Sequence, residues 1–211
     1  MDFSLNEEQK MFRAMFRDFA AKEIAPRAEE IDHEETLPPD MLQKAANQGF
    51  LGATLPEAYF GAGLDGVSYA MLIEAIAGAC MSVAVTVATH VSLVAMSILD
   101  HGTDVQKEEW LIPMATGEVI GAFALTEADA GSDGMALQTR ATLDGDEVVL
   151  DGIKAWVANG GIAGLFVVFA RGSEGVEAFL VPRDAPGMTV GYREPTLGLR
   201  SVAFNTVYLE G

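Results

Sequence analysis

Residues 121–134 read Gly-Ala-Phe-Ala-Leu-Thr-Glu-Ala-Asp-Ala-Gly-Ser-Asp-Gly, and residues 154–161 read Lys-Ala-Trp-Val-Ala-Asn-Gly-Gly. The first segment is a small-residue turn with a hydroxyl on each side, Thr126 and Ser132. The second is an aromatic side chain followed by small residues and an Asn-Gly pair. A flat, conjugated ligand with polar edges needs such parts, because it uses backbone N–H groups, hydroxyls and an aromatic plane. The pattern before this stretch is helical and the pattern after it is that of β-strands, so the stretch marks a border between two kinds of structure.

The composition describes a folded, strongly acidic chain. Its 211 residues are 50% hydrophobic, enough for one or two domains with a sizeable core. The formal net charge of -18 disfavours nucleic acid and an anionic membrane surface as partners. A phosphate-bearing ligand can still bind through backbone amides and a few local basic side chains.

The single cysteine, Cys80, allows no intrachain disulfide and favours a reducing, cytoplasmic location. It lies in an apolar run with no base spaced near it, so we expect a buried small hydrophobe rather than a nucleophile. The N-terminal residues include acids and no basic segment, which is not the pattern of a signal peptide.

Residues 75–99 contain no Asp, Glu, Lys or Arg and are long enough to span a bilayer. However, Gly78 interrupts the run, Ser and Thr recur through it, and no Lys or Arg flanks it. We therefore predict two helices that meet near residues 78–82, the second buried on most sides in a helical domain. A membrane span is the alternative, and it would be excluded if the chain were soluble without detergent.

The first half of the chain carries local signals for helices. Ser4-Leu-Asn-Glu7 and Thr103-Asp-Val-Gln106 have the spacing of capping boxes, and Pro38-Pro39-Asp40 is typical of a helix start. The first helix would have one apolar face, made of Phe12, Met15, Phe16 and Phe19. We predict four or five helices before about residue 118, arranged as an up-and-down bundle.

One glycine pattern in this half is misleading. Gly61-Ala-Gly63-Leu-Asp-Gly66 formally matches a dinucleotide-binding fingerprint. No apolar strand precedes it, and no acidic residue follows at the distance that a ribose contact needs. We interpret the segment as a loop between helices.

The second half has short apolar segments separated by turn-forming residues, which is typical of β-structure. Asp144-Gly145 is a strong hairpin signal, and Gly and Pro separate the other apolar segments. We expect strands at residues 120–125, 139–143, 147–150, 153–157, 165–170, 176–181 and 203–209. The predicted fold class is α+β, with an N-terminal helical domain at residues 1–118 and a small antiparallel β-barrel or sandwich domain at residues 119–211.

The order of these motifs resembles the flavin-dependent acyl-CoA dehydrogenases. The segments that carry the resemblance are residues 122–133 and 152–160, Leu197-Gly-Leu-Arg-Ser201, Leu55-Pro-Glu and Gly102-Thr-Asp-Val-Gln-Lys107. The resemblance covers the whole chain. It implies FAD as the cofactor, α,β-dehydrogenation of an acyl-CoA thioester, transfer of the electrons to an electron-transfer flavoprotein, and a homo-oligomer.

The resemblance also implies site residues. Phe123, Leu125 and Thr126 would contact the isoalloxazine, with Thr126 bonding its pyrimidine edge. Ser132 would lie near the flavin phosphates and the pantetheine arm of the substrate, and is therefore both a cofactor and a substrate contact. Trp156 would pack beside the ring, with Val157 and Ala158 offering backbone contacts. Taken singly, these residues are typical of an ordinary turn or of a core; their joint order indicates a flavin site.

Two substitutions depart from the family pattern. Ala128 stands where the family often has Pro, which should loosen the turn slightly. Ala158 stands where the family often has Thr, so a hydroxyl that would reach flavin N5 is missing. We expect an altered flavin environment or weaker binding.

The resemblance assigns the catalytic base to a C-terminal helical domain that lies beyond these 211 residues. No residue here takes that role, so we expect the chain alone to be inactive. Glu127 and Asp133 are interpreted as solvated or turn-stabilising carboxylates, and the three histidines are given no catalytic or metal-binding role. Two alternatives stay open: a non-catalytic half that binds flavin or acyl-CoA with a partner chain, and a flavin oxidase or monooxygenase on the same fold.

Overall fold

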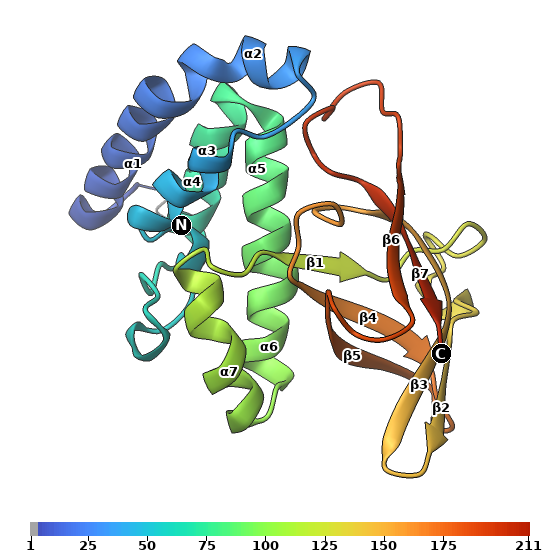
Figure 1. Cartoon of the computed structure of the whole chain (residues 1–211). Helices are drawn as coiled ribbons and strands as arrows, with labels where there is room; N and C mark the ends of the chain where they lie inside the picture. The colour runs from blue at the N-terminus through green and yellow to red at the C-terminus, as the bar shows by residue number, and fades with distance from the viewer. Residues whose placement is uncertain (1–3) are drawn as a thin grey trace. The chain divides into compact units, whose positions relative to one another are not determined.

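The computed structural model describes residues 4–211, which form two compact units. One unit holds the residues up to Glu118 together with Leu197–Val202, and the other holds Val119–Thr196 with Ala203–Gly211. The first is helical and the second contains all the strands (Figure 1). The predicted α+β class, with a helical region followed by a β domain, is confirmed.

The helical unit is built from seven α-helices and short 3₁₀ or π turns within the described residues. The helices are α1 Glu7–Phe19, α2 Ala28–His33, α3 Pro39–Asn47, α4 Gly66–Ala79, α5 Met81–Ala88, α6 Met96–His101 and α7 Asp104–Ala115. The shorter turns are η1 Ala20–Ile24, η2 Ala25–Arg27, η3 Phe50–Gly52, η4 Glu57–Tyr59 and η5 Thr89–Ala95. Residues 61–65 form a loop that leads into α4 at Gly66, and none of the described residues before it forms a strand, as predicted.

Helix α1 begins slightly later than its predicted cap. Asn6, not Ser4, is the N-cap: its side chain accepts the N–H of Gln9 at 2.8 Å, and the Gln9 side chain accepts the N–H of Asn6 at 3.1 Å. Asn-x-x-Gln has the same spacing as the motif predicted at Ser4 and closes the same reciprocal pair of bonds. The predicted box at Thr103 and Gln106 is confirmed at the start of α7.

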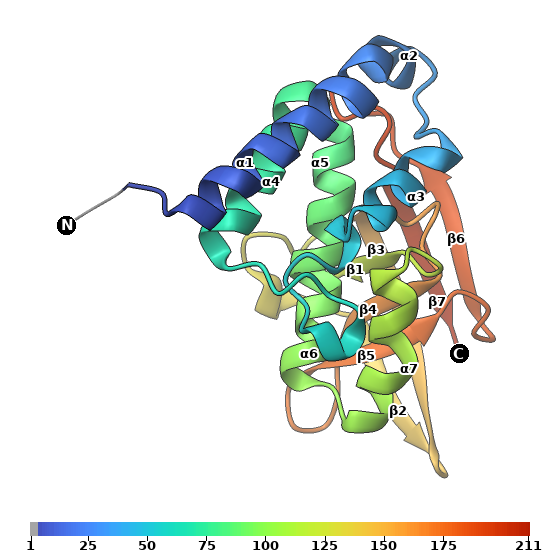
Figure 2. The same cartoon turned by 90° about the vertical axis from the view of Figure 1, so that its left-hand side faces the viewer.

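The core of the helical unit begins with the apolar face of α1. The Phe16 and Phe19 rings meet Phe50 edge to face, at 5.5 and 5.0 Å between centroids, an arrangement that aromatic pairs favour. Met15, predicted on the same face, is instead 40% exposed. Helix α1 lies beside α4, as the two views show (Figures 1 and 2).

The uncharged run forms two helices that part at Cys80, as predicted. Cys80 has extended backbone angles, φ -154° and ψ 112°, between α4 and α5, and it is half-buried rather than fully buried. Helix α5 then continues through η5 into α6 as one rod (Figure 1). Within residues 4–211 this rod, Met81–His101, is the one helix long and apolar enough to cross a membrane, with a mean hydropathy of 1.9. Because 61% of its most apolar window is buried inside the structure, a core helix accounts for it equally well.

The second unit is a seven-stranded mixed sheet. Its strands are β1 Gly121–Ala124, β2 Arg140–Asp144, β3 Glu147–Val157, β4 Leu165–Arg171, β5 Val176–Pro182, β6 Met188–Arg193 and β7 Asn205–Glu210. The order is β1-β4-β2-β3-β7-β6, with β5 paired to β4. Most pairs are antiparallel, as expected, but β1 pairs parallel to β4 and β2 meets β4 in parallel at one position.

Two strand predictions need correction. Residues 147–150 and 153–157 form one strand, β3, because Gly152 continues the ladder opposite Leu209 instead of ending it. Strand β6 was not predicted, since it is short and contains Gly191, a weak strand former. The hairpin at Asp144-Gly145 is confirmed, with Asp144 opposite Glu147 and Gly145 at φ 65°.

The segment Leu197–Val202, which the sequence places in the β domain, belongs to the helical unit in the structure. Arg200 pairs with Asp32 and lies 3.4 Å from Glu35. The hydroxyl of Ser201 donates to the carbonyl oxygen of Ile31. These bonds give the segment its partners among residues 31–35, far from it in sequence.

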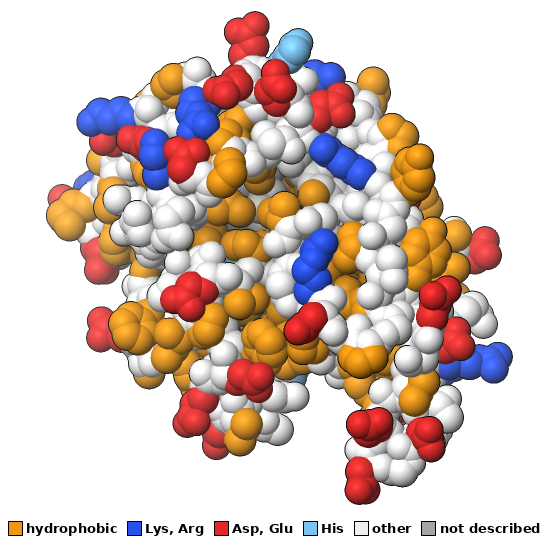
Figure 3. Space-filling model, viewed as in Figure 1, with side chains coloured by type: hydrophobic (Ala, Val, Ile, Leu, Met, Phe, Trp, Pro, Cys, Tyr) orange, Lys and Arg blue, Asp and Glu red, His pale blue; other side chains and the backbone are white. Residues whose placement is uncertain are grey.

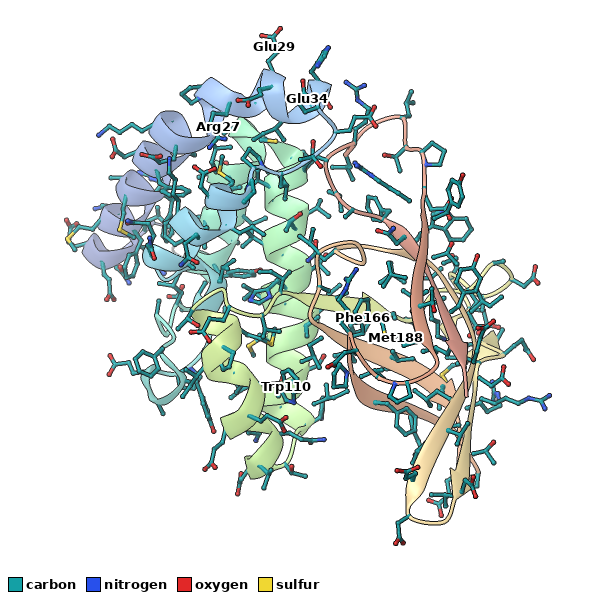
Figure 4. The ribbon with its side chains drawn as sticks, viewed as in Figure 1. Arg27, Glu29, Glu34, Trp110, Phe166 and Met188 are labelled. Atoms are coloured by element: carbon teal, nitrogen blue, oxygen red, sulfur yellow. The ribbon has the colours of Figure 1, made fainter. Side chains whose placement is uncertain are left out.

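The core of the sheet lies on one of its faces. It is made of Ala122, Ala124, Val157, Ala163, Phe166, Val168, Val181, Val207 and Leu209. Met188 packs against this cluster, which contains Phe166 (Figure 4). Since side chains alternate along a strand, Phe123 and Leu125 of the β1 segment face the opposite side from Ala122 and Ala124.

Candidate functional site

The two motifs from the sequence meet where β1 ends beside β3. The backbone N–H of Ala155 donates to the carbonyl oxygen of Thr126 at 2.9 Å. This bond joins two residues that are 29 positions apart in the chain. The structure therefore brings Thr126 next to Ala155, the residue before Trp156.

A β-bulge turns Trp156 outward. The register of β3 on β7 shifts between Lys154 and Val157, and Trp156 within this shift has φ 51°, in the left-handed region. A bulky side chain rarely adopts that conformation, and bulges often redirect a side chain near a functional site. Trp156 is 52% exposed, so its ring presents a large aromatic surface to whatever binds there.

The residues next to Trp156 have different surroundings. Val157 is 1% exposed and its side chain packs in the core of the sheet, so almost none of this residue, backbone included, is open to a ligand in the structure. Ala158 is partly buried at the start of the turn after β3. Asn159, at φ 64°, is fully buried, and its side-chain amide donates to the carbonyl oxygen of Gly121 at 3.1 Å. The amide of Asn159 thus ties this turn to the start of β1.

On the β1 side, Phe123, Leu125 and Thr126 are all partly exposed. The Phe123 ring packs against Phe169 of β4 with 5.0 Å between centroids. Leu125 lies next to the glycine turn, because a Cβ added at Gly134 would be 3.6 Å from Leu125 Cδ2. Ser132 is exposed in that turn, further along the chain from Thr126.

Two anchors fix the loop between Thr126 and β2. Glu127 and Ala130 exchange backbone bonds of 3.0 and 3.2 Å, which close a tight turn. The Arg171 guanidinium donates to the carbonyl oxygens of Met135 and Leu137 at 2.5 and 3.4 Å. The exposed Ser132 is therefore carried on a loop held at both ends.

Behind the exposed residues lies a buried charged cluster that the sequence did not predict. Lys154 is 0% exposed, and its ammonium donates to Glu127 Oε1 at 2.7 Å and to the carbonyl oxygen of Leu125 at 3.1 Å. Glu127, 8% exposed, also accepts the N–H groups of Gln138 and Thr139 at 2.6 and 2.9 Å. The Thr139 hydroxyl donates to it at 2.5 Å. Glu127 is thus a fully bonded carboxylate in the interior, not a solvated one.

The environment shifts the pKa of both partners. Burial by itself raises the pKa of Glu127, but the hydrogen bonds from Lys154, Thr139 and Gln138 outweigh it and hold that pKa at about 2. Burial lowers the pKa of Lys154, and its bond to Glu127 opposes that effect. The Glu127 carboxyl is therefore charged at neutral pH. The stability due to the carboxylate is complete above its ordinary pKa of 4.5 and is lost as the pH falls toward 2.

Gly152 makes this cluster possible. A Cβ at Gly152, whose φ is +156°, would lie 2.4 Å from Thr139 Oγ1 and 2.7 Å from Thr139 Cα. Only glycine lets β3 approach Thr139 so closely. The sequence gives only a weak signal for this ion pair. Glu127 and Lys154 both lie in apolar segments, but they are 27 residues apart and their spacing does not indicate that they are in contact.

Comparison with known proteins identifies the fold. The family model for the acyl-CoA dehydrogenase N-terminal domain matches residues 6–118, and the model for the acyl-CoA dehydrogenase middle domain matches residues 122–211. The chain belongs to the acyl-CoA dehydrogenase family.

Three relatives of this family show how far the similarity extends. The chain is 40% identical over 215 residues to the short-chain specific acyl-CoA dehydrogenase of Clostridium acetobutylicum, covering 100% of this chain and 57% of that protein. A glutaryl-CoA dehydrogenase from Mycobacterium smegmatis, solved in complex with FADH2, superposes with a TM-score of 0.94 at 33% identity, covering 98% of this chain and 53% of that one. A chain in the structure of the electron transferring flavoprotein of Acidaminococcus fermentans gives 0.95 at 37% identity, covering 100% and 57%. The 211 residues therefore span little more than half the length of the chains they match.

Proposed function

We propose that these residues form the cofactor-binding part of an FAD-dependent acyl-CoA dehydrogenase, and that the whole protein acts on short-chain acyl-CoA thioesters. The observation that supports this is the 2.9 Å bond from the N–H of Ala155 to the carbonyl oxygen of Thr126, which joins the segment of Thr126 to the segment of Trp156. The resemblance assigns both residues to the flavin; Trp156 is half-exposed and Thr126 is partly exposed, so both side chains are accessible to a ligand. The short-chain relative at 40% identity supports the substrate class.

The residues present fit an isoalloxazine. Trp156 offers a plane to stack on, and Phe123 and Leu125 offer apolar contact on the face of β1 away from the core. Thr126 would hydrogen-bond the polar edge of the ring, Ala158 would contribute backbone groups, and Ser132 would lie by the phosphates and the acyl-CoA. When bound, FAD supplies the acceptor for the hydride that leaves the substrate β-carbon.

A titration of the purified chain with FAD tests this proposal. We expect saturable binding, seen as quenched flavin fluorescence, that weakens about tenfold in Trp156→Ala and in Thr126→Ala. Tyr192→Ala is the control for the tryptophan, since Tyr192 is an aromatic residue of the same unit that is 86% exposed. Thr142→Ala, at an exposed position of β2, is the control for the threonine. Equal loss of affinity in the controls would contradict the proposed site.

The departure at Ala158 gives a second test of the same site. If a hydroxyl at this position would reach the flavin, Ala158→Thr should tighten FAD binding about threefold to tenfold, the value of one added hydrogen bond. The same variant should alter the visible spectrum of the bound flavin. Weaker binding in Ala158→Thr would place this position away from the ring.

Catalysis is proposed to need more than these residues. The resemblance places the base that removes the substrate α-proton beyond the matched length, and the chain covers 57% of its short-chain relative. We propose that residues 1–118 and 119–211 act as two domains of the whole protein, which would form a homo-oligomer and pass electrons to an electron-transfer flavoprotein. Turnover of any acyl-CoA by the pure 211-residue chain would refute the proposed inactivity.

A further inference from the structure

The buried pair Glu127–Lys154 lies directly behind Thr126 and Trp156 and makes more bonds than an ion pair requires. We infer that Lys154, held by Glu127, is a positioning residue that fixes Leu125–Glu127 and the bulge at Trp156 in the arrangement that receives the flavin. This inference rests on the proposed function, because it concerns the same site. Neither Glu127 nor Lys154 is among the site residues that the family resemblance predicts.

The first step of the argument is the geometry around Thr126. The Lys154 ammonium bonds to Leu125 through its backbone carbonyl, at 3.1 Å, and to Glu127 through its carboxylate, at 2.7 Å. The residue between them, Thr126, accepts the N–H of Ala155 at 2.9 Å. Three consecutive residues of one motif are therefore bonded to two consecutive residues of the other.

The second step concerns Trp156. Its left-handed backbone, φ 51°, is unfavourable for a large side chain and persists only when its neighbours hold it. Ala155 on one side is bonded to Thr126, and Val157 on the other side is packed in the core of the sheet at 1% exposure. Lys154 fixes the β1 segment that Ala155 bonds to. Loss of the ammonium should therefore loosen the conformation of Trp156.

The third step is energetic. A buried ion pair contributes little net stability compared with apolar side chains of the same volume, whereas removal of one partner alone is costly. The position of the Leu125–Glu127 segment, by contrast, depends on the pair, because the Leu125 carbonyl oxygen needs a hydrogen-bond donor at position 154. A variant without the charges can thus regain stability and still lose the geometry. That difference separates a positioning role from a merely structural one.

The experiment compares Lys154→Met with the double variant Glu127→Gln/Lys154→Met. The amide introduced by Glu127→Gln would carry no charge and keep one oxygen for the N–H and hydroxyl of Thr139, while its NH2 group would replace the oxygen that accepts the N–H of Gln138. Lys44→Met is the control, because Lys44 makes a bond of the same 2.7 Å length to Glu23 in the helical unit. All variants carry Trp110→Phe, which removes the tryptophan of α7 (Figure 4) and leaves Trp156 as the sole indole emitter.

Three quantities are measured on each variant: the urea midpoint, the Kd for FAD and the emission of Trp156. We expect Lys154→Met to lower the midpoint and the double variant to recover part of it, because the buried unpaired charge is gone. In both, FAD should bind about tenfold more weakly, the effect of losing a hydrogen bond from a charged group, and Trp156 emission should shift to longer wavelength. Lys44→Met should change neither the Kd nor the emission.

The inference is overturned if the double variant recovers stability and binds FAD like the parent chain. If the parent chain binds no FAD, the proposed function fails for these residues, and Trp156 emission alone decides the positioning role: an unchanged spectrum in the double variant overturns it. If neither Lys154 variant folds, Thr139→Val takes their place, since it removes only the 2.5 Å bond to Glu127. We then expect about threefold weaker FAD binding, and unchanged binding and emission overturn the inference.

Discussion

The imidazole of His90 is enclosed in the core of the helical unit at 0% exposure. Its Nε2–H donates to the carbonyl oxygen of Met114 at 3.1 Å. Burial lowers the pKa of His90 from 6.5 to about 4, although the backbone groups of Met114 and Leu51 favour the charged form. His90 has no role visible in the sequence, and in the folded state it is neutral at neutral pH and gains a proton only near pH 4.

This makes a prediction about stability and pH. Below pH 6.5 the unfolded chain binds a proton at His90, whereas the folded chain binds it only near pH 4. The free energy of unfolding therefore falls as the pH falls from 6.5 to about 4. We expect the free energy of unfolding to drop by about 2–3 kcal/mol from this source between roughly pH 7 and pH 4.5. In His90→Gln, measured by urea unfolding, that part of the slope should vanish. His33→Gln, at an exposed position, should keep the slope; equal slopes in parent and His90→Gln would contradict the prediction.

At the scale of an element, the turn that closes Glu127 and Ala130 shows how local chemistry supports the site. Neither Ala128 nor Asp129 has a positive φ, which excludes the mirror-image turns and type II and fits a type I turn. Proline suits the first central position of a type I turn and is disfavoured at the second. The family's frequent Pro at position 128 is therefore compatible with this backbone.

We predict that Ala128→Pro stabilises the chain by about 0.4–1 kcal/mol, because it restricts the unfolded state more than the folded one. Asp129→Pro, one position later in the same turn, should destabilise it, since Pro there forces the preceding residue out of its helical conformation. Thermal unfolding of the two variants checks both signs. A loss of stability in Ala128→Pro would show that the turn differs from type I.

A pair of glycines gives a second test at this scale. Gly152→Ala should cost more than about 2 kcal/mol, because the new Cβ clashes with Thr139 on a φ that alanine avoids. Gly78, inside α4, has open space around its Cα, so Gly78→Ala should stabilise by about 0.5–1 kcal/mol. Urea unfolding of both variants is the measurement. If Gly152→Ala were neutral, the close approach of β3 to Thr139 would not be needed for the cluster.

At the scale of the whole molecule, the acidic excess is the dominant property. There are 31 acidic and 13 basic residues, a formal net charge of -18. Acidic side chains spread over the visible face instead of forming one patch (Figure 3). The exposed ion pairs, such as Lys22–Asp18, are each worth less than about 1 kcal/mol in general, so overall repulsion outweighs them.

We therefore predict that salt stabilises this protein. Raising NaCl from roughly 0.01 M to about 0.3 M shortens the range of the repulsion and should raise the free energy of unfolding by about 1 kcal/mol. The gain should shrink as the pH approaches the pI of about 4.3, where the net charge disappears. Destabilisation by salt at neutral pH would mean that specific ion pairs dominate the electrostatics instead.

Much of the fold was predictable because its signals are short-range. The box at Thr103 and Gln106, the Pro39 helix start and the Asp144-Gly145 turn all depend on bonds between residues a few positions apart. A glycine that usually ends a strand gave a wrong boundary where strand pairing continues through it: Gly152 lies inside β3, opposite Leu209. The parallel pairing of β1 with β4 could not be predicted from strand patterns, since its partners are distant in the chain, Gly121 opposite Leu165.

The family, the helical and β-rich halves, and the motifs that the resemblance assigns to the flavin all follow from the sequence without its structure. They do so because those features reside in the order of residues along the chain. The packed chain was needed to establish that Trp156 points outward from a bulge, that His90 is neutral in a core, and that Glu127 and Lys154 meet behind Thr126. Each of these depends on the register of strands or the packing of helices distant in sequence, and burial, which sets the energy of a charge, exists only once those elements have come together.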